Sequence, residues 1–558
     1  MSGINTYTGP TTVNAGALIV NGSIETSSPL TVNVGATVGG DGNLPTTIVN
    51  GGTLSPCNSV GQLNVIGNLQ FNAGSLYQVE VFGASADKTR VTGAATLLGG
   101  TVQVAILGPM QFGTPYTIVS TGSGVTGQFA GLSGGTNYVD MALSYPGQDV
   151  LLTLTPAFGS FDGLNVNQRS TATGLDHGLL QAGTSAGFDA LFQLPPALLP
   201  NALTQLSGEL GTAAAPAGLE SMNRFLMLML DPFAGTRGDD GTVGPALGFA
   251  PAPPSRDAAK AYAAFLPITK APALAFEERW TGWGAAYGSY SSADGDGLIG
   301  SHDRTVRTGH IAAGFDRRLS SNTVVGLALS GGSANFQLAS GLGSGRGDIL
   351  QGGVYGATRF DSYYLAVSLA ASFYDVSADR IVTLPISSTL AAAYQAHGFG
   401  ACIEGGRRFV VAGTGVTPFV AVQVQTIRTD SYSEQAAIGG AGIALNYAAQ
   451  TTSRLRTEIG VAVDRRVGEV WGGSFNLFAR IAWAHEYWRD NSIVAAFQTL
   501  PGSGFTVEGA APAGNAALLA AGAELKFANG LSLRGKLEGE FAGSVTSYAA
   551  SATLRKTW

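Results

Sequence analysis

The second half of the chain alternates apolar and polar residues with a period of two. In the segments 363–373, 453–463 and 531–541, the odd-numbered positions are mostly apolar or glycine, and the charged residues and most of the serines fall on even-numbered positions. Side chains alternate between the two faces of a strand, so each segment is a predicted strand with one apolar and one polar face. The segments are about ten residues long, the length that a tilted strand needs to cross a bilayer.

Twelve such strands are predicted between residues 276 and 558. They begin near Trp280, Arg304, Asn322, Asp348, Ser362, Leu390, Val416, Ser453, Ser474, Ala516, Leu531 and Ser547. The connections after the first, fifth, seventh and ninth strands are long, as in the glycine-rich stretch 490–512, whereas those after the second, fourth, eighth and tenth are short, as in 528–530. An even number of strands with short turns on one side and long loops on the other is typical of an outer-membrane barrel.

Composition supports a membrane barrel over a soluble enzyme. Only 12% of the 558 residues are charged and 80 are glycine, against about 25% charged and roughly 7% glycine in typical globular chains. The longest dense apolar run, 225–230, is far too short for a membrane helix, and a closed barrel is the other structure that satisfies its backbone in lipid. The net charge of −7, with no basic run, argues against a nucleic-acid partner.

Residues 1–157 carry a degenerate repeat. Short β-branched stretches end in asparagine followed closely by glycine, at Asn14, Asn33, Asn50 and Asn72. This spacing lies in the range of solenoid coils, and asparagine and glycine tolerate left-handed turns. The repeat predicts a parallel β-helix, with a β-sandwich as the alternative.

Residues 158–275 have a different pattern. Apolar residues at helical spacing predict short helices between 170 and 210, and a further helix follows Pro216. On that helix Leu219 lies on an apolar face, whereas Glu220, Asn223 and Arg224 are polar. The stretch 235–272, rich in Gly, Ala, Pro and Asp, predicts a linker. We therefore expect an all-β chain with a short helical linker between β-helix and barrel.

The charged faces of the predicted barrel strands are the main candidate site. If their apolar faces contact lipid, these charges line the lumen, either as a hydrated path or as barrel filling that pairs across strands. The candidate lumen residues are Arg454, Arg456, Glu458, Arg480, Arg534, Lys536, Glu538 and Glu540. At the end of the last strand, Trp558 shares a face with Tyr548 and Leu554, and aromatic residues at a strand end suit the membrane interface.

Catalytic and metal-binding patterns are weak. Two stretches fit the G-x-S-x-G nucleophile pattern, at Ser133 and Ser185, but neither has the strand-turn-helix setting and general base that the motif needs. The five histidines show no metal spacing, and Cys57 and Cys402 predict neither a metal site nor a bridge. We expect no enzyme activity and no cofactor.

Three stretches resemble the autotransporter family of type V secreted proteins of Gram-negative bacteria. Residues 5–16 resemble the strand repeat of autotransporter passengers, and residues 52–61 resemble a passenger turn in which glycine usually stands at the position of Cys57. The third stretch is the barrel from Trp280 to Trp558.

The resemblance implies a passenger remnant over 1–157, a linker over 158–275 and a translocator barrel over 276–558. It implies that residues 217–230, with Leu219, Glu220, Asn223 and Arg224, form the candidate pore helix, although a core helix outside the pore fits the sequence equally well. It also implies that Trp558 and its strand, with Tyr548 and Leu554, are the barrel-assembly signal. Lys556 departs from the family pattern, in which an aromatic residue is common there.

The expected function is to export and anchor the chain's own N-terminal passenger in the bacterial outer membrane. The expected partners are membrane lipid, the outer-membrane barrel-assembly machinery, the passenger itself and an unidentified host or cell-surface ligand. Two alternatives remain open: a surface adhesin or structural β-helix, and the anchor of an enzyme passenger missing upstream of Met1. Since Met1 opens no signal peptide, we also expect a fragment of a longer exported protein.

Overall fold

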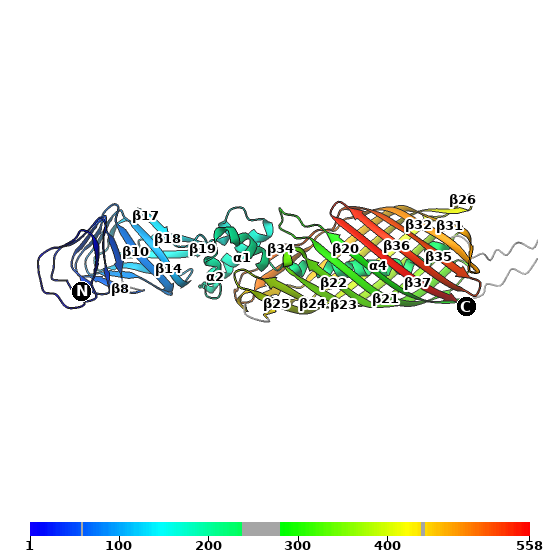
Figure 1. The fold of residues 1–558 in the computed structure, drawn as a ribbon, viewed down its shortest axis with the longest axis horizontal. Coiled ribbons are helices and arrows are strands. Elements are labelled where there is room, and N and C mark those ends of the chain that lie inside the picture. Colours follow the sequence, from blue (N-terminus) through cyan, green and yellow to red (C-terminus); the bar gives the residue numbers. More distant parts are fainter. Residues whose placement is uncertain (57–59, 237–278, 437–440) are drawn as a thin grey trace, which may run out of the picture.

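The computed structural model describes residues 1–56, 60–236, 279–436 and 441–558. The molecule is elongated, with stacked strands at the N-terminal end, helices in the middle and a barrel at the C-terminal end (Figure 1). Cys57 and most of the predicted linker, 237–272, lie outside the described residues. Within the described ranges, no helix combines the length and the apolar character needed to cross a bilayer.

The N-terminal strands stack as coils with three sheets. The first sheet contains β1 (Thr11–Val13), β3 (Leu30–Asn33), β6 (Thr47–Asn50), β9 (Leu69–Phe71), β13 (Ala95–Leu98) and β16 (Val125–Gln128). The second contains β2 (Gly16–Ile19), β4 (Ala36–Gly40), β7 (Thr53–Pro56), β10 (Leu76–Gly83), β14 (Thr101–Met110) and β17 (Gly131–Gly134), with β11 (Ser85–Ala86) folded back on β10. The third contains β5 (Asn43–Leu44), β8 (Gln62–Val65), β12 (Lys88–Val91), β15 (Tyr116–Thr121), β19 (Asp149–Pro156) and β18 (Val139–Ser144). Within residues 1–56 and 60–157, neighbouring coils pair in parallel, and the antiparallel strand pairs involve β11, β18 and β19, so a β-helix fits these residues and a sandwich does not.

An asparagine ladder aligns the first coils. The side-chain amide of Asn33 donates to Asn14 at 2.8 Å, Asn50 donates to Asn33 at 3.1 Å, and Asn72 donates to Asn50 at 3.1 Å. The glycines that follow these asparagines, at 16, 35, 51 and 74, all have φ between 75° and 80°. The structure therefore confirms the turns that the repeat predicted. Each turn needs a residue in the left-handed conformation, which glycine adopts without a steric penalty.

A helical segment connects the β-helix to the barrel. Its helices are α1 (Val166–Ala182), α2 (Asp189–Phe192), α3 (Leu199–Leu206) and α4 (Ala214–Thr236), with 3₁₀ turns η1 (Phe158–Ser160), η2 (Pro196–Leu198) and η3 (Glu209–Thr212). Asn165 caps α1 and forms a capping box with Gln168. One continuous apolar core runs from the β-helix through α1–α3 into the loops at the barrel mouth.

The C-terminal strands close into a twelve-stranded antiparallel barrel. They are β20 (Trp280–Ala293), β21 (Arg304–Arg318), β22 (Thr323–Leu338), β23 (Gly343–Phe360), β24 (Tyr363–Val382), β25 (Ser388–Arg407), β27 (Thr414–Thr429), β31 (Gln450–Val470), β32 (Gly473–Glu486), β35 (Asn515–Phe527), β36 (Leu531–Ala542) and β37 (Val545–Thr557). The last strand, β37, pairs with the first, β20, from Thr281–Thr557 to Ala293–Val545, and this seam leaves no open edge. The predicted strand count and closure are confirmed.

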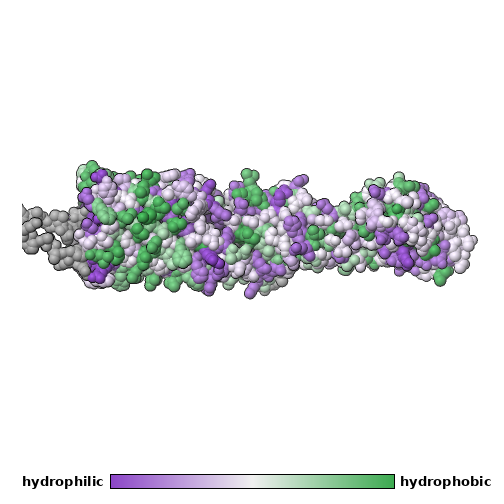
Figure 2. Space-filling view, turned by 180° about the vertical axis from the view of Figure 1, so that it is seen from behind, coloured by the Kyte–Doolittle hydropathy of each residue, from purple (hydrophilic) through white to green (hydrophobic). Residues whose placement is uncertain are grey.

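The outer wall of the barrel is apolar. On the face shown in Figure 2, hydrophobic residues gather over the barrel, and hydrophilic residues border them at the end nearer the helical segment. Strands β24 and β25 are each 20 residues long, about twice what the bilayer requires. They therefore extend beyond the membrane on the side of the long loops.

The long loops contain strands that the sequence did not reveal. The stretch 490–512, predicted as a loop, contains β33 (Ser492–Phe497) and β34 (Phe505–Glu508). These pair with β28 (Tyr432–Ser433) and β30 (Leu445–Tyr447) in a small four-stranded sheet at the barrel mouth. Two further short strands, β26 (Phe409–Val411) and β29 (Gln435–Ala436), extend the edges of barrel hairpins.

Candidate functional site

Helix α4 lies inside the barrel, where it contacts strands on both sides of the lumen. Near the start of the helix, the Tyr374 hydroxyl of β24 donates to the Gly218 carbonyl at 3.2 Å. Near its end, Lys536 of β36 lies 2.6 Å from the Asp231 carboxylate. Tyr374 is on the long-loop half of its strand and Lys536 is close to the short turn 528–530, so the helix runs along the lumen from one mouth toward the other (Figure 1).

One face of α4 is apolar and packs against the apolar half of the lumen. Its buried residues Met222, Phe225, Leu226 and Met229 form one cluster with side chains from β20 to β27, among them the aromatic rings of Trp283, Tyr287, Tyr355, Tyr364 and Phe419. Glycines allow a close approach, because a Cβ at Gly400 would lie 2.8 Å from a Leu226 methyl. This half of the lumen is lined by apolar and aromatic side chains, which explains how so apolar a helix occupies a barrel interior.

The opposite face of α4 is polar and pairs with the other half of the wall. Arg224 lies 2.8 Å from Glu220 one turn earlier and 3.4 Å from Glu538 of β36, and it donates to the Ser547 hydroxyl of β37 at 3.0 Å. The Asn223 side chain accepts a 3.1 Å hydrogen bond from Gln423 of β27. These contacts fix the rotation of the helix about its axis.

All eight candidate lumen residues point inward, and the structure brings seven of them into ion pairs or hydrogen bonds with other wall residues or with α4. Arg456 is shared by three carboxylates, with Glu458 at 3.3 Å, Glu486 at 3.3 Å and Glu540 at 3.1 Å. Arg480 bridges Glu404 at 2.6 Å and Glu458 at 2.9 Å. The remaining members of the set contact the helix or its neighbours: Lys536 pairs with Asp231 and Glu538, Arg534 donates to the Asp231 carbonyl, and Arg454 lines a cavity beside Glu220.

A polar cavity lies between the polar face of α4 and the wall. It is lined by Glu220, Asn223, Arg304, Gln425 and Glu486, among others, and its volume is about 50 Å³. That volume exceeds what one water needs, and the lining supplies several polar partners. Within the described chain, buried side-chain atoms of Arg304, Gln425 and Glu486 lack hydrogen-bond partners. The polar half of the lumen is therefore suited to hold water.

The long-loop mouth is closed by what we term the mouth cap, residues 158–212 together with β28, β30, β33 and β34. Asn167 of α1 makes two hydrogen bonds to the backbone of Glu508, at 2.8 and 2.9 Å. Buried Glu209 accepts from the His302 backbone N–H at 2.6 Å and lies 2.7 Å from the ring Nδ1. This hydrogen bond raises the pKa of His302, which stands in the loop before β21.

A second buried pair ties the cap to the barrel wall. Arg380 of β24 donates to both carboxylate oxygens of Glu434, at 2.7 and 2.6 Å, and to the Gln205 carbonyl of α3 at 2.8 Å. Tyr447 donates to the same carboxylate at 2.9 Å. Such bidentate, charge-assisted geometry is specific in direction, so it fixes the loop sheet and α3 relative to the wall.

The C-terminal strand presents its candidate residues to the outside. Tyr548, Leu554 and Trp558 are exposed by 52%, 52% and 60%. Backbone hydrogen bonds join Trp558 and Trp280 in both directions, at 3.0 and 3.2 Å, where the barrel closes. The chain end therefore lies on the short-turn side, at the seam between the first and last strands.

Comparison with known proteins identifies this barrel. Residues 282–538 match the family model "Autotransporter beta-domain". The barrel is an autotransporter β-domain. This family match places the protein in the bacterial outer membrane, with the barrel wall in lipid.

Relatives and solved structures are similar over part of the chain. An extracellular serine protease of Serratia marcescens is 32% identical over 181 residues, which are 30% of this chain and 17% of that protein. Esterase EstA of Pseudomonas aeruginosa is 32% identical over 121 residues, 22% of this chain and 18% of that protein. The chain thus spans less than a fifth of the length of these curated relatives. The translocator domain of NalP from Neisseria meningitidis has 13% identity and a TM-score of 0.40, covering 50% of this chain and 88% of that one; the β-domain of Bordetella BrkA has 21% identity and a TM-score of 0.38, covering 50% and 98%.

The serines of the two G-x-S-x-G stretches, Ser185 and Ser133, both contact or belong to the β-helix. Ser185 is fully buried, and its hydroxyl donates to Asp189 at 2.5 Å and accepts from the Met110 backbone at 2.7 Å. It thereby joins the β-helix to α2. Ser133 lies in β17, at the end of the second β-helix sheet. Among the described residues, no cluster of His, Cys, Asp and Glu could hold a metal ion.

Several lumen residues of the autotransporter β-domain were missed from the sequence. His310 of β21 lies 3.3 Å from the Ser221 hydroxyl of α4 and stacks on Tyr287 with centroids 5.1 Å apart. Glu404 and Glu486 complete the arginine clusters. The alternation along β25 and β32 already carried a signal for the two glutamates, because they occupy inward positions of those strands. Nothing in the sequence alone linked His310 to Ser221.

Proposed function

We propose that the barrel exports the N-terminal segment of its own chain across the outer membrane and then anchors it at the cell surface. The path of the chain carries the proposal. Residues 158–212 lie at the long-loop mouth with the β-helix beyond them (Figure 1), β20 begins at the short-turn mouth, and α4 runs through the lumen between the two mouths. Because the strands form a closed wall, this path joins the two mouths of the barrel through the lumen, which is the arrangement that export through the barrel would leave behind. Long loops face the cell exterior in such barrels.

In this proposal residues 1–157 are the passenger, 158–275 connect it to the barrel, and residues 217–230 of α4 are the pore helix. The two halves of the lumen have different tasks. The polar half supplies a hydrated surface past which an unfolded chain can move without desolvating its backbone. The apolar half holds the helix after transport, because burial of Met222, Phe225, Leu226 and Met229 stabilises it there.

We further propose that the C-terminal strand is read by the outer-membrane barrel-assembly machinery. Tyr548, Leu554 and Trp558 support this role, since they form an exposed row on the last strand, next to the closing seam. The protease and esterase names describe relatives that this chain covers by less than a fifth, and the barrel itself acts as conduit and anchor.

The test is surface exposure of the passenger. An epitope is placed at the Gly74 turn of the β-helix, and the chain is expressed behind a cleavable export signal in a Gram-negative host. External protease should remove the epitope from intact cells and leave the barrel protected, with the barrel migrating differently on gels before and after heating.

A matched variant separates export from assembly. A shortened chain of residues 158–558, which lacks the passenger, should form a barrel with the same heat-dependent mobility on gels. An epitope that stays protected until the cells are lysed, in cells whose barrel is assembled, would contradict the proposal.

A further inference from the structure

The hairpin that joins β31 to β32 projects from the barrel on the short-turn side, which faces the periplasm in such barrels. Strand β27 pairs with β31 only as far as Arg465, and beyond that residue β31 has β32 as its one strand partner in the described part of the chain. Every residue from 465 to 472 is exposed, on both faces of the hairpin. We term these residues the periplasmic ribbon, because they stand free of the barrel wall.

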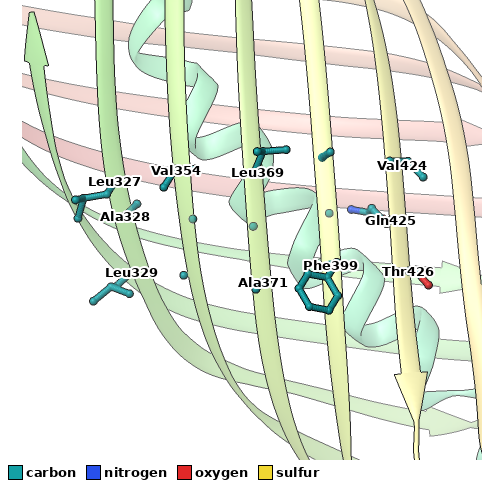
Figure 3. Close-up of a pocket in the computed structure, with 15 residues that line it drawn as sticks. Leu327, Ala328, Leu329, Val354, Leu369, Ala371, Phe399, Val424, Gln425 and Thr426 are labelled. Carbon is teal, nitrogen blue, oxygen red and sulfur yellow. The ribbon is translucent and has the colours of Figure 1, made fainter.

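Large apolar side chains on the barrel wall are exposed because lipid covers them. In the hollow over β22 to β27, Leu329, Leu369 and Phe399 are exposed in this way within the apolar wall (Figure 3). On β31 the outward side chains are apolar at Ile459, Val461 and Val463 and become charged at Arg465. The apolar band on this strand therefore ends near Arg465.

Trp471 lies beyond the reach of that lipid. From Arg465 to Trp471 the ribbon extends about 20 Å at about 3.3 Å per residue, or about 15 Å along the barrel axis for a strand tilted by about 40°. The headgroup layer on one side of a bilayer is only about 5–8 Å thick. An interfacial anchor in the membrane therefore does not explain this side chain.

The turn itself does not favour Trp471 either. The side chain is 86% exposed, and φ is 51° at Trp471 and 75° at Gly472, so both central residues of the two-residue turn are left-handed. Turns with this backbone prefer asparagine before glycine, and a bulky residue in that position is strained. Since burial does not compensate for the strain, contact with a partner outside the chain would explain the ring.

The residues beside Trp471 define the chemistry of such a partner. Arg465 is exposed and makes no ion pair or hydrogen bond with any residue that the structure describes. Arg466 and Glu469 are exposed too and pair with each other at 3.0 Å. The register between β31 and β32 shifts at Val467 in a bulge, and bulges and charged residues protect an edge against an added strand. A flat ring beside a free guanidinium suits a ligand with flat apolar faces and carboxylates.

We propose that the periplasmic ribbon binds peptidoglycan, the polymer of amino sugars and acidic peptides that lies on this side of the outer membrane. The Trp471 ring lies against the C–H face of a sugar, and Arg465 pairs with a carboxylate of a peptide stem. Arg466 and Glu469 supply hydrogen-bonding groups for hydroxyls and amides. This contact ties the barrel to the cell wall. It depends on the position of the barrel in the membrane and not on export, so the two proposals can fail separately.

The test is co-sedimentation with isolated peptidoglycan. The full chain is purified in detergent and mixed with sacculi that have been boiled in detergent and digested with trypsin, so that the polymer is free of bound protein. The chain should sediment with the sacculi, and soluble fragments released by a muramidase should compete. A chain that stays in the supernatant, or sedimentation that the fragments do not reduce, would overturn the proposal.

Matched variants separate binding from folding. Trp471→Asn removes the ring and supplies the residue that the turn prefers, so retention should fall about tenfold or more while the unfolding midpoint on heated gels stays the same or rises. Ala412→Asn makes the same exchange in the neighbouring hairpin, where φ is 50° at Ala412 and 73° at Gly413, and should sediment as the parent does. Arg465→Gln should weaken retention about tenfold, as expected for loss of one charge-assisted hydrogen bond. Equal retention by the two asparagine variants, or a midpoint that falls in Trp471→Asn, would overturn the assignment.

Discussion

Replacement of Arg456 by methionine tests whether the lumen charges hold the barrel together. The Arg456 side chain is 9% exposed and is the shared partner of Glu458, Glu486 and Glu540, at 3.1 to 3.3 Å. Methionine keeps much of the apolar volume and removes the charge. Three carboxylates then remain close together at low exposure. Arg480 still pairs with Glu458, and Arg454 lines the same cavity as Glu486 and Glu540 without an ion pair to either.

The expected loss is large because the cost lies in the groups left behind. Removing one member of a buried ion pair costs about 3–5 kcal/mol. A domain of this size loses about 2–4 °C of its midpoint per kcal/mol, so the unfolding midpoint should fall by roughly 10 °C. Arg466→Met provides the matched control on the same strand, since Arg466 pairs with Glu469 at 3.0 Å with both side chains more than 60% exposed. Exposed pairs contribute about 0–1 kcal/mol.

The assay is the temperature at which the band of the folded barrel converts to the unfolded band on a gel after a fixed heating time. Adding Glu540→Gln to the Arg456→Met variant should recover part of the loss, because one of the stranded charges is then neutral. If Arg456→Met and Arg466→Met lower the midpoint equally, the reasoning that buried lumen pairs stabilise the barrel is refuted.

Three further predictions concern the helix, the mouth cap and the β-helix. Gly400→Leu should displace α4 and cost about 1–3 kcal/mol by overpacking, since even a Cβ there meets Leu226 and Met222 within 3 Å; the gel midpoint should fall, and an unchanged midpoint would contradict the close helix–wall contact. The pKa of His302 is raised, so its ion pair with Glu209 stabilises the cap fully at pH values below the ordinary pKa of histidine. This stabilisation is lost as the pH rises through the raised pKa. Protease cleavage of the loop 294–303 should increase over that pH interval, and His302→Gln should remove the pH dependence. Asn33→Ala breaks two ladder bonds and Asn14→Ala breaks one, so urea unfolding of the β-helix should show losses of about 2 and about 1 kcal/mol, respectively; equal losses would argue against the ladder.

The sequence predicted the strands well because a strand repeats every two residues. Alternation over 531–541 and 453–463 identified both the existence of the strands and the side chains that face inward, and the start of each of the twelve barrel strands was predicted within about five residues. Closure followed from the membrane environment, because lipid offers no hydrogen-bond partner to an open strand edge. The spacing of Asn14, Asn33, Asn50 and Asn72 likewise identified the coils, since each coil places its asparagine above the last.

The position of α4 could not be read from its own residues. Its apolar face suggested a core helix and its polar face a wet lumen, and the structure satisfies both because the barrel interior is divided into an apolar half and a polar half. That division depends on strands more than a hundred residues apart, such as β24 and β36. The strands within 490–512 were missed for a related reason: they are short and are stabilised by partners in another loop and by α1.

Local pattern therefore determined the secondary structure of this protein, the faces of its strands and the membrane as its environment, because backbone geometry repeats within a few residues. Tertiary structure decided the partners. Arg224 meets Glu538, Glu209 meets His302, and Leu329 and Thr426 share a row on the outer wall only once twelve strands have closed in one register. Contacts between such distant positions leave no period in a single sequence, and both the position of α4 in the lumen and the mouth cap depend on them.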